Sequence, residues 1–168
     1  MHKESVSVAP HLALWAGVDV AKATFQAALW GHQPFRERHV RGFPRTRQGA
    51  SELLAWFHEC GGPKAPFRVV MEATGALASE LASWLLALEP GLHISIVNPR
   101  RTSSYLDSLG LRNKTDDQDA RALAGYGQER HPQAWLPPLE AQAILRDLVR
   151  TRLDLVEERT AMRLRLQD

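Results

Sequence analysis

Short apolar runs alternate with helical patterns along most of this chain, and this alternation is the feature that most restricts its fold. The expected strands cover residues 12–20, 24–30, 37–42, 67–71 and 92–97. The expected helices cover residues 46–60, 78–88, 100–109, 116–127 and 139–168. Three strands joined by short links predict an antiparallel meander, and later strands separated by helices predict parallel pairing. The order therefore predicts an α/β fold in which helices flank a mixed sheet.

Composition and a Pro-rich break divide the chain into parts. The chain has 168 residues, of which 44% are hydrophobic, and this is enough for one compact domain with an appendage. No apolar run approaches the roughly 20 residues needed to span a bilayer, and Cys60 is the only cysteine. We therefore expect a soluble cytoplasmic protein with no membrane partner and no internal disulfide. The expected parts are a disordered N-terminus at 1–11, a folded domain at 12–130, a linker at 131–138 and a helix at 139–168.

The last expected part, 139–168, is predicted to be one long helix of coiled-coil type. Leu145, Leu148 and Leu155 lie on one stripe at helical spacing. Arg152 and Arg159 fall in the same stripe, which argues against a simple dimeric coiled coil. These arginines could face carboxylates or nucleic acid, or could extend along a wide interface. The pattern reaches the last residue without a capping signal, which favours a truncated helix.

One short stretch holds three carboxylates within four positions, Asp116, Asp117 and Asp119. Thr115 and Gln118 form a capping-box pattern, and a helix start alone explains Asp116 and Asp117 as first-turn acids. It explains Asp119 less well, because the dipole effect fades within the first turn. Asp116 and Asp119 share one face of such a helix, where a divalent metal would offset their repulsion. The local pattern leaves both interpretations open.

Two further acids stand alone beside expected strands. Asp19 interrupts the first apolar run, and Glu72 follows the fourth. A carboxylate in an apolar strand costs several kcal/mol unless it is paired or bound to metal. The first strand of a meander often lies centrally, beside the next parallel strand, so Asp19 and Glu72 are expected to be neighbours at one edge of the sheet. Together with Asp116 and Asp119, they could hold two Mg²⁺ or Mn²⁺ ions that clamp a phosphodiester.

Four motifs in this order point to a known family: Gly17–Lys22 (GVDVAK), Met71–Gly75 (MEATG), Val97–Pro99 (VNP) and Lys114–Ala124 (KTDDQDARALA). Over about residues 14–128 the chain resembles the N-terminal domain of the DEDD transposases, the insertion-sequence recombinase family that includes the Piv-type DNA invertases. Each motif alone is weak, whereas four in order are specific. The resemblance implies an RNase H-like (RuvC-like) fold and a transposase or DNA recombinase that cleaves and rejoins DNA strands.

The same resemblance implies an acidic tetrad of Asp19, Glu72, Asp116 and Asp119 that binds Mg²⁺ or Mn²⁺ and serves catalysis. Asp117 is then left outside the tetrad, because the family pattern spaces its last two acids by three positions. Spacing of three also puts two side chains on one helix face.

The resemblance also implies partners. These are DNA, a structured guide (bridge) RNA and further copies of the chain, in a homodimer or tetramer formed through 139–168. Family members are considerably longer and carry a nucleophilic serine in a C-terminal domain. We therefore expect this chain to be an N-terminal part that does not complete recombination alone.

Basic residues flank the acids, and we expect them to bind nucleic acid by neutralising phosphates: Lys22, Arg100, Arg101, Arg112 and Lys114. The alternative is that they balance the acids when no metal is bound. A second basic stretch, 32–47, holds five arginines, two histidines and one glutamate. This stretch could bind a phosphate backbone, or it could be an ordinary solvated edge strand and loop, and the sequence favours neither. Tyr105 and Tyr126 are expected to be core or rim residues more often than base-stacking ones.

Three other functions remain open from the sequence. A nuclease or resolvase would use the same tetrad for simple hydrolysis. A non-catalytic RNA-binding and dimerising module would need only the basic residues and the last helix. A sugar-kinase-like or actin-like ATPase also carries an early strand-borne aspartate, but it is disfavoured because the chain has no Gly-rich phosphate loop.

Overall fold

The sheet is the frame of the protein. The computed structural model describes residues 13–30, 40–62, 65–108 and 116–165. Its strands are β1 (Leu14–Val20), β2 (Thr24–Trp30), β3 (Val40–Pro44), β4 (Phe67–Glu72) and β5 (His93–Val97). They are ordered β3-β2-β1-β4-β5, and β1 pairs antiparallel with β2 and parallel with β4. The predicted meander, central first strand and mixed sheet are confirmed.

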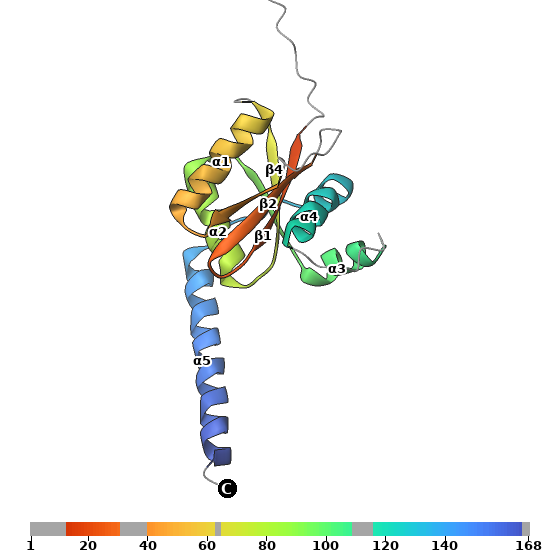
Figure 1. Cartoon of the computed structure of the whole chain (residues 1–168). Helices are drawn as coiled ribbons and strands as arrows, with labels where there is room; N and C mark the ends of the chain where they lie inside the picture. The colour runs from red at the N-terminus through yellow and green to blue at the C-terminus, as the bar shows by residue number, and fades with distance from the viewer. Residues whose placement is uncertain (1–12, 31–39, 63–64, 109–115, 166–168) are drawn as a thin grey trace, which may run out of the picture. The chain divides into compact units, whose positions relative to one another are not determined.

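Helices cover both faces of this sheet (Figure 1). The helices beside the sheet are α1 (Arg47–Gly61), α2 (Ala76–Leu88), α3 (Pro99–Ser108) and α4 (Asp116–Arg130). A further helix, α5 (Glu140–Arg165), belongs to a separate compact unit. Helices α1 and α2 lie on one face, whereas α4 packs across β1 and β2 on the other face, with α3 beside it. This mixed five-stranded sheet between helices is the α/β arrangement that the alternation of strands and helices predicted. None of the described helices is both long and apolar enough to cross a membrane.

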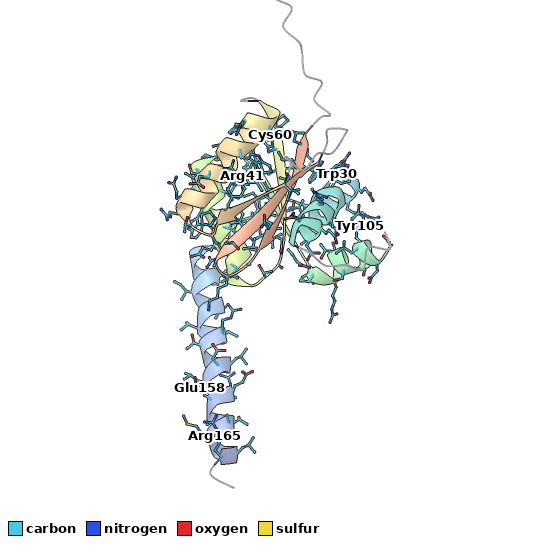
Figure 2. All side chains as sticks on the ribbon, viewed as in Figure 1. Trp30, Arg41, Cys60, Tyr105, Glu158 and Arg165 are labelled. Atoms are coloured by element: carbon cyan, nitrogen blue, oxygen red, sulfur yellow. The ribbon has the colours of Figure 1, made fainter. Side chains whose placement is uncertain are left out.

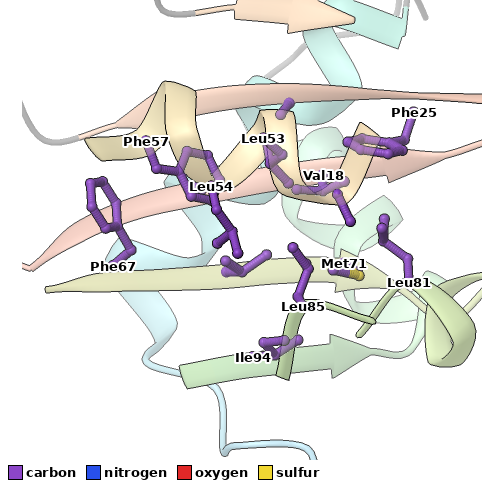
Figure 3. Packing of buried hydrophobic residues seen from close by; sticks show 14 of the residues in the cluster. Val18, Phe25, Leu53, Leu54, Phe57, Phe67, Met71, Leu81, Leu85 and Ile94 are labelled. Atoms are coloured by element: carbon purple, nitrogen blue, oxygen red, sulfur yellow. The ribbon is translucent and has the colours of Figure 1, made fainter. Parts of the chain in front are cut away.

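The α1–α2 face carries the larger apolar core (Figure 3). Leu53 and Phe57, one helical turn apart on α1, are fully buried against the sheet. The Thr46 side chain caps α1 by accepting a 3.0 Å hydrogen bond from the Gly49 amide. Strand residues Val18 and Met71 project into the same core, because alternate strand positions face alternate sides of the sheet. This core stabilises the sheet that carries Asp19 and Glu72.

On the opposite face, glycines let α4 lie directly on the strands. A Cβ atom added at Gly17 would lie 2.0 Å from the Ala120 carbonyl oxygen, so no side chain fits there. A Cβ atom at Gly127 would lie 2.5 Å from the Trp15 ring. The predicted end of this helix at about Gly127 is wrong, because α4 continues to Arg130. Gly127 therefore lies inside α4, where it lets the helix pack closely against strand side chains, and it does not end the helix.

The third strand also differs from the sequence prediction. It was expected at 37–42 but forms at 40–44, and residues 37–39 lie outside the described part of the chain. Phe43 is buried and stacks on Phe25, with ring centroids 5.4 Å apart. This packing extends the strand beyond Gly42, because Phe43 gains a core position there. The other boundaries of the strands and of α1, α2 and α3 agree with the predictions to within two residues. Helix α5 begins one residue later than predicted, and its predicted last residues, 166–168, lie outside the described part of the chain.

The segment after α4 runs beside β5. The Trp135 amide donates a 2.6 Å hydrogen bond to the Ile94 carbonyl, and the buried Ser95 hydroxyl donates a 3.0 Å hydrogen bond to the Pro132 carbonyl. Part of the expected linker therefore packs against the folded domain.

The chain divides into two compact units between Trp135 and Leu136. The second unit contains α5, a helix of 26 residues. Large apolar side chains along α5 are exposed within this unit: Ile144, Leu145, Leu148, Val149, Leu153, Leu155, Met162 and Leu164. The predicted long helical pattern in this region is confirmed.

Candidate metal centre

Two of the predicted acidic residues lie at matching positions on neighbouring strands. In the parallel β1–β4 ladder, Val18 lies opposite Met71. Asp19 and Glu72 are the next residue on each strand, and neighbouring strands lie about 4.8 Å apart. Because Val18 and Met71 face the α1–α2 core, alternation directs Asp19 and Glu72 to the α4 face.

Glu72 is oriented by a hydroxyl from α3. The Thr102 hydroxyl lies 2.6 Å from Glu72 Oε1 and 2.9 Å from the Pro99 carbonyl oxygen, so both oxygens can accept from it. Thr102 is only 5% exposed, which shields this hydrogen bond from water. Sequence reasoning missed Thr102, because a bond between residues 30 positions apart leaves no local pattern.

Helix α4 brings a third carboxylate, that of Asp119, to a cavity that Glu72 lines. Asp119 is half-buried and lines a small cavity that Glu72, Thr102 and Tyr105 also line. Asp117, two residues earlier, is exposed. This difference fits the prediction that Asp119 rather than Asp117 faces the other acids.

The fourth predicted carboxylate belongs to the first residue of α4. The helix begins at Asp116, but the side chain of Asp116 lies outside the described part of the structure. Thr115, Arg112 and Lys114 also lie outside it, so the predicted cap and two predicted basic contacts stay predictions.

Among the described side chains, no three or more His, Cys, Asp or Glu residues form a ready metal-binding group. The Asp116 side chain is not among these described side chains. The donor chemistry itself fits a hard divalent cation, because Asp19, Glu72 and Asp119 offer only carboxylate oxygens and share one face of the sheet.

The described basic residues are exposed around this site. Arg100 and Arg101 lie in the first turn of α3, and Lys22 lies in the turn after β1. The Arg45 side chain supports that turn, because its Nε donates a 2.9 Å hydrogen bond to the Lys22 carbonyl. Arg45 also pairs with Glu80.

The two tyrosines are packing residues. Tyr105 and Tyr126 are each 7% exposed and meet edge to face, with ring centroids 5.5 Å apart. Tyr105 is labelled in Figure 2. The Tyr105 hydroxyl donates a 2.8 Å hydrogen bond to Glu129. Burial, aided by this hydrogen bond, raises the pKa of Tyr105 to about 12, so the phenol stays protonated at neutral pH. The sequence expectation that these residues are core or rim is confirmed.

Comparison with known proteins places the chain among transposases. The DEDD transposase family of the IS110 type, described as "Transposase", matches residues 16–168. The pilin gene-inverting protein of Moraxella lacunata is 35% identical over 150 residues, which cover 87% of this chain and 45% of that protein. The pilin gene-inverting protein of Moraxella bovis is 34% identical over the same shares. The chain therefore spans less than half the length of these curated relatives.

Among solved structures, Thermus thermophilus RuvC matches with a TM-score of 0.45 and 16% identity, over 73% of this chain and 99% of RuvC. The complex of the same RuvC with a Holliday junction substrate matches with a TM-score of 0.43 and 17% identity, over the same shares.

Proposed function

This chain belongs to the DEDD transposase family, and we propose that it forms the metal-binding catalytic domain of a transposase or site-specific DNA recombinase. The observation that supports this most directly is the β1–β4 register, which gives Asp19 and Glu72 corresponding positions on adjacent strands. Asp119 strengthens the proposal, because it lines the same cavity as Glu72.

Asp19, Glu72, Asp116 and Asp119 would hold the metal, Mg²⁺ or Mn²⁺, through carboxylate oxygens. When bound, such ions polarise a phosphodiester and stabilise the leaving oxygen during strand cleavage. The protein's own part is to orient the donors. Glu72 is held by the Thr102 hydroxyl, and Asp119 is carried by a helix that rests on the sheet at Gly17.

DNA is the proposed substrate, with phosphates contacted by basic residues around the acids: Lys22, Arg100, Arg101, Arg112 and Lys114. Exposure of Lys22, Arg100 and Arg101 supports this role. Strand rejoining would further require the serine nucleophile that the family resemblance assigns to a C-terminal domain. A structured guide RNA is the proposed means of choosing the DNA sites.

Self-association into a homodimer or tetramer is proposed to occur through α5. Exposed apolar side chains along this helix support the proposal, since burying each would yield about 1.5–3 kcal/mol. Arginines in the same stripe, Arg152 and Arg159, would limit a tightly packed two-stranded interface.

The test of the metal site is titration of the protein with Mn²⁺ by calorimetry. Asp19→Ala, Glu72→Ala and Asp119→Ala are each expected to weaken binding at least tenfold, because each removes a ligand. Asp117→Ala is the matched control on the same helix and should bind as the unmodified protein does. Unchanged binding in all three ligand variants would exclude the proposed site.

A second test separates recombination from hydrolysis. The chain is incubated with Mn²⁺ and supercoiled or branched DNA, and nicked products are measured by gel electrophoresis. We expect little nicking, because the proposed serine attack lies outside this domain. Robust nicking that Asp119→Ala abolishes would instead identify a metal-dependent nuclease.

A further inference from the structure

A continuous groove lies between α3, α4 and the segment after α4. Two hollows of about 370 and 480 Å³ share three lining residues, Arg101, Tyr126 and Arg130. Both volumes are in the range of ligand-binding sites, about 300–1,000 Å³. Because the hollows share these residues, we treat them as one feature and call it the α3–α4 groove.

The lining of this groove is basic. Arg100, Arg101 and Arg130 line it and are exposed, and no acidic residue is among its described lining residues. Within the described part of the chain, no ion pair joins these three arginines to a carboxylate, whereas Arg45 is paired with Glu80. Their guanidinium groups can therefore bind an external anion, and their planar forks suit phosphate oxygens.

The floor of the groove is aromatic, and polar groups line one end of it. Tyr105 and Tyr126 form the floor and hold one edge-to-face arrangement. Glu129, a carboxylate that contacts this floor, accepts a hydrogen bond from the Tyr105 hydroxyl. Asn98 and Gln133 add amide groups at one end. Three exposed arginines along one groove suit a repeating anionic chain better than a single small ligand.

The groove leads towards the acidic residues. Tyr105 lines the α3–α4 groove and also lines the cavity that contains Glu72 and Asp119. A strand that lies in the groove would therefore pass next to the candidate metal centre. Arg130 lies at the far end of α4 from Asp119, so the two ends of the helix would serve different tasks.

We propose that the α3–α4 groove binds the sugar-phosphate backbone of a nucleic-acid strand, with Arg101 and Arg130 as its phosphate contacts. Arg130 was not marked by any sequence motif, because it is a single basic residue at a helix end. The inference rests on the proposed function in one respect: the bound strand is the one presented to the acidic residues.

The experiment measures binding in EDTA, so that metal plays no part. Labelled random-sequence duplex DNA and a stem–loop RNA of similar length are titrated with the protein at several salt concentrations. The variant Arg101→Gln/Arg130→Gln is expected to weaken binding and to reduce the slope of log K against log salt by about 2, roughly one per lost phosphate contact. Loss with DNA only, RNA only or both identifies the strand that the groove accepts.

Arg150→Gln is the matched control, because Arg150 is an exposed arginine of α5, and no α5 residue is among the described lining residues of the groove. It should retain the affinity and the salt slope of the unmodified protein. Thermal unfolding of all variants checks that these surface changes leave the fold intact. An unchanged slope in the double variant, or an equal loss in Arg150→Gln, would overturn the proposal.

The outcome is separable from that of the proposed function. Asp119→Ala should bind nucleic acid in EDTA at least as well as the unmodified protein, because it removes a negative charge. If the carboxylate variants retain Mn²⁺ binding while the arginine variants lose nucleic acid, the metal site fails and the groove stands. The reverse result would remove the groove and leave the metal site.

Discussion

The two faces of the sheet are built by different means. On the α1–α2 face, large side chains such as Leu53, Phe57 and Leu85 fill the space between helix and strands. On the α4 face, Gly17 and Gly127 bring helix backbone and strand into direct contact, and the apolar cluster is smaller. The first face supplies most of the hydrophobic stabilisation, whereas the second sets the distance between a helix and two strands.

The difference explains where the acids are tolerated. Asp19 and Glu72 face the α4 side, where they are half-buried rather than enclosed. The same carboxylates on the α1–α2 side would be enclosed by apolar side chains, at a cost of several kcal/mol each. The thick core therefore stabilises the sheet, and this stability allows the opposite face to carry repelling charges.

The largest expected effect comes from the α1–α2 face. Leu53→Ala should lower the free energy of unfolding by about 2–5 kcal/mol, because it leaves a cavity in a fully enclosed position. Mn²⁺ affinity of the folded protein should remain unchanged. Denaturant unfolding measures the first quantity and calorimetry the second. Ser51→Ala, on the exposed side of the same helix, is the control; a similar loss there would contradict the assignment.

Gly17→Ala is expected to lower the free energy of unfolding less than Leu53→Ala does, but to weaken Mn²⁺ binding more. The new methyl group would meet the Ala120 carbonyl, so α4 must shift, at a cost of about 1–3 kcal/mol. Because Asp119 moves with α4, Mn²⁺ binding should weaken as well. Gly42→Ala is the control, since its methyl group would meet only the flexible end of Gln26. Intact Mn²⁺ affinity in Gly17→Ala would show that α4 does not position the site.

Thr102→Val tests the orientation of Glu72 without changing side-chain shape. Loss of the hydroxyl should reduce Mn²⁺ affinity roughly tenfold to a hundredfold, as is typical for groups that orient a metal ligand. Thr102→Ser, which keeps the hydroxyl, should restore most of the affinity. Equal affinities in the Val and Ser variants would mean that the hydrogen bond does not matter for metal binding.

The smallest expected effect concerns Tyr105. Tyr105→Phe should cost about 1 kcal/mol near neutral pH by removing the hydrogen bond to Glu129. Because the folded-state pKa is raised from 10.0 to about 12, the stabilisation is complete below pH 10 and is lost as the pH rises through 12. The difference in unfolding free energy between the two proteins should therefore shrink over this range. A constant difference would contradict the raised pKa.

The order of the strands could be predicted from the sequence, whereas the side-chain contacts around the acidic residues could not. Strand order follows from short links and apolar runs, so the adjacency of β1 and β4, which aligns Asp19 with Glu72, could be predicted. The hydrogen bond from Thr102 and the contacts of Gly17 and Gly127 could not, because each joins residues far apart in the chain. Glycine within a helix normally indicates weakness or an end, and here it indicates close packing.

Residues 132–135 have a practical consequence for work on this domain. An edge strand offers unpaired backbone groups to any other extended chain, and β5 is such an edge. The Trp135 amide donates a hydrogen bond to the Ile94 carbonyl of this edge, and the Ser95 hydroxyl donates one to the Pro132 carbonyl of the segment. A version shortened before Pro132 would leave this edge bare and prone to aggregation. Domain fusions and crystallisation variants should therefore retain the chain through Trp135.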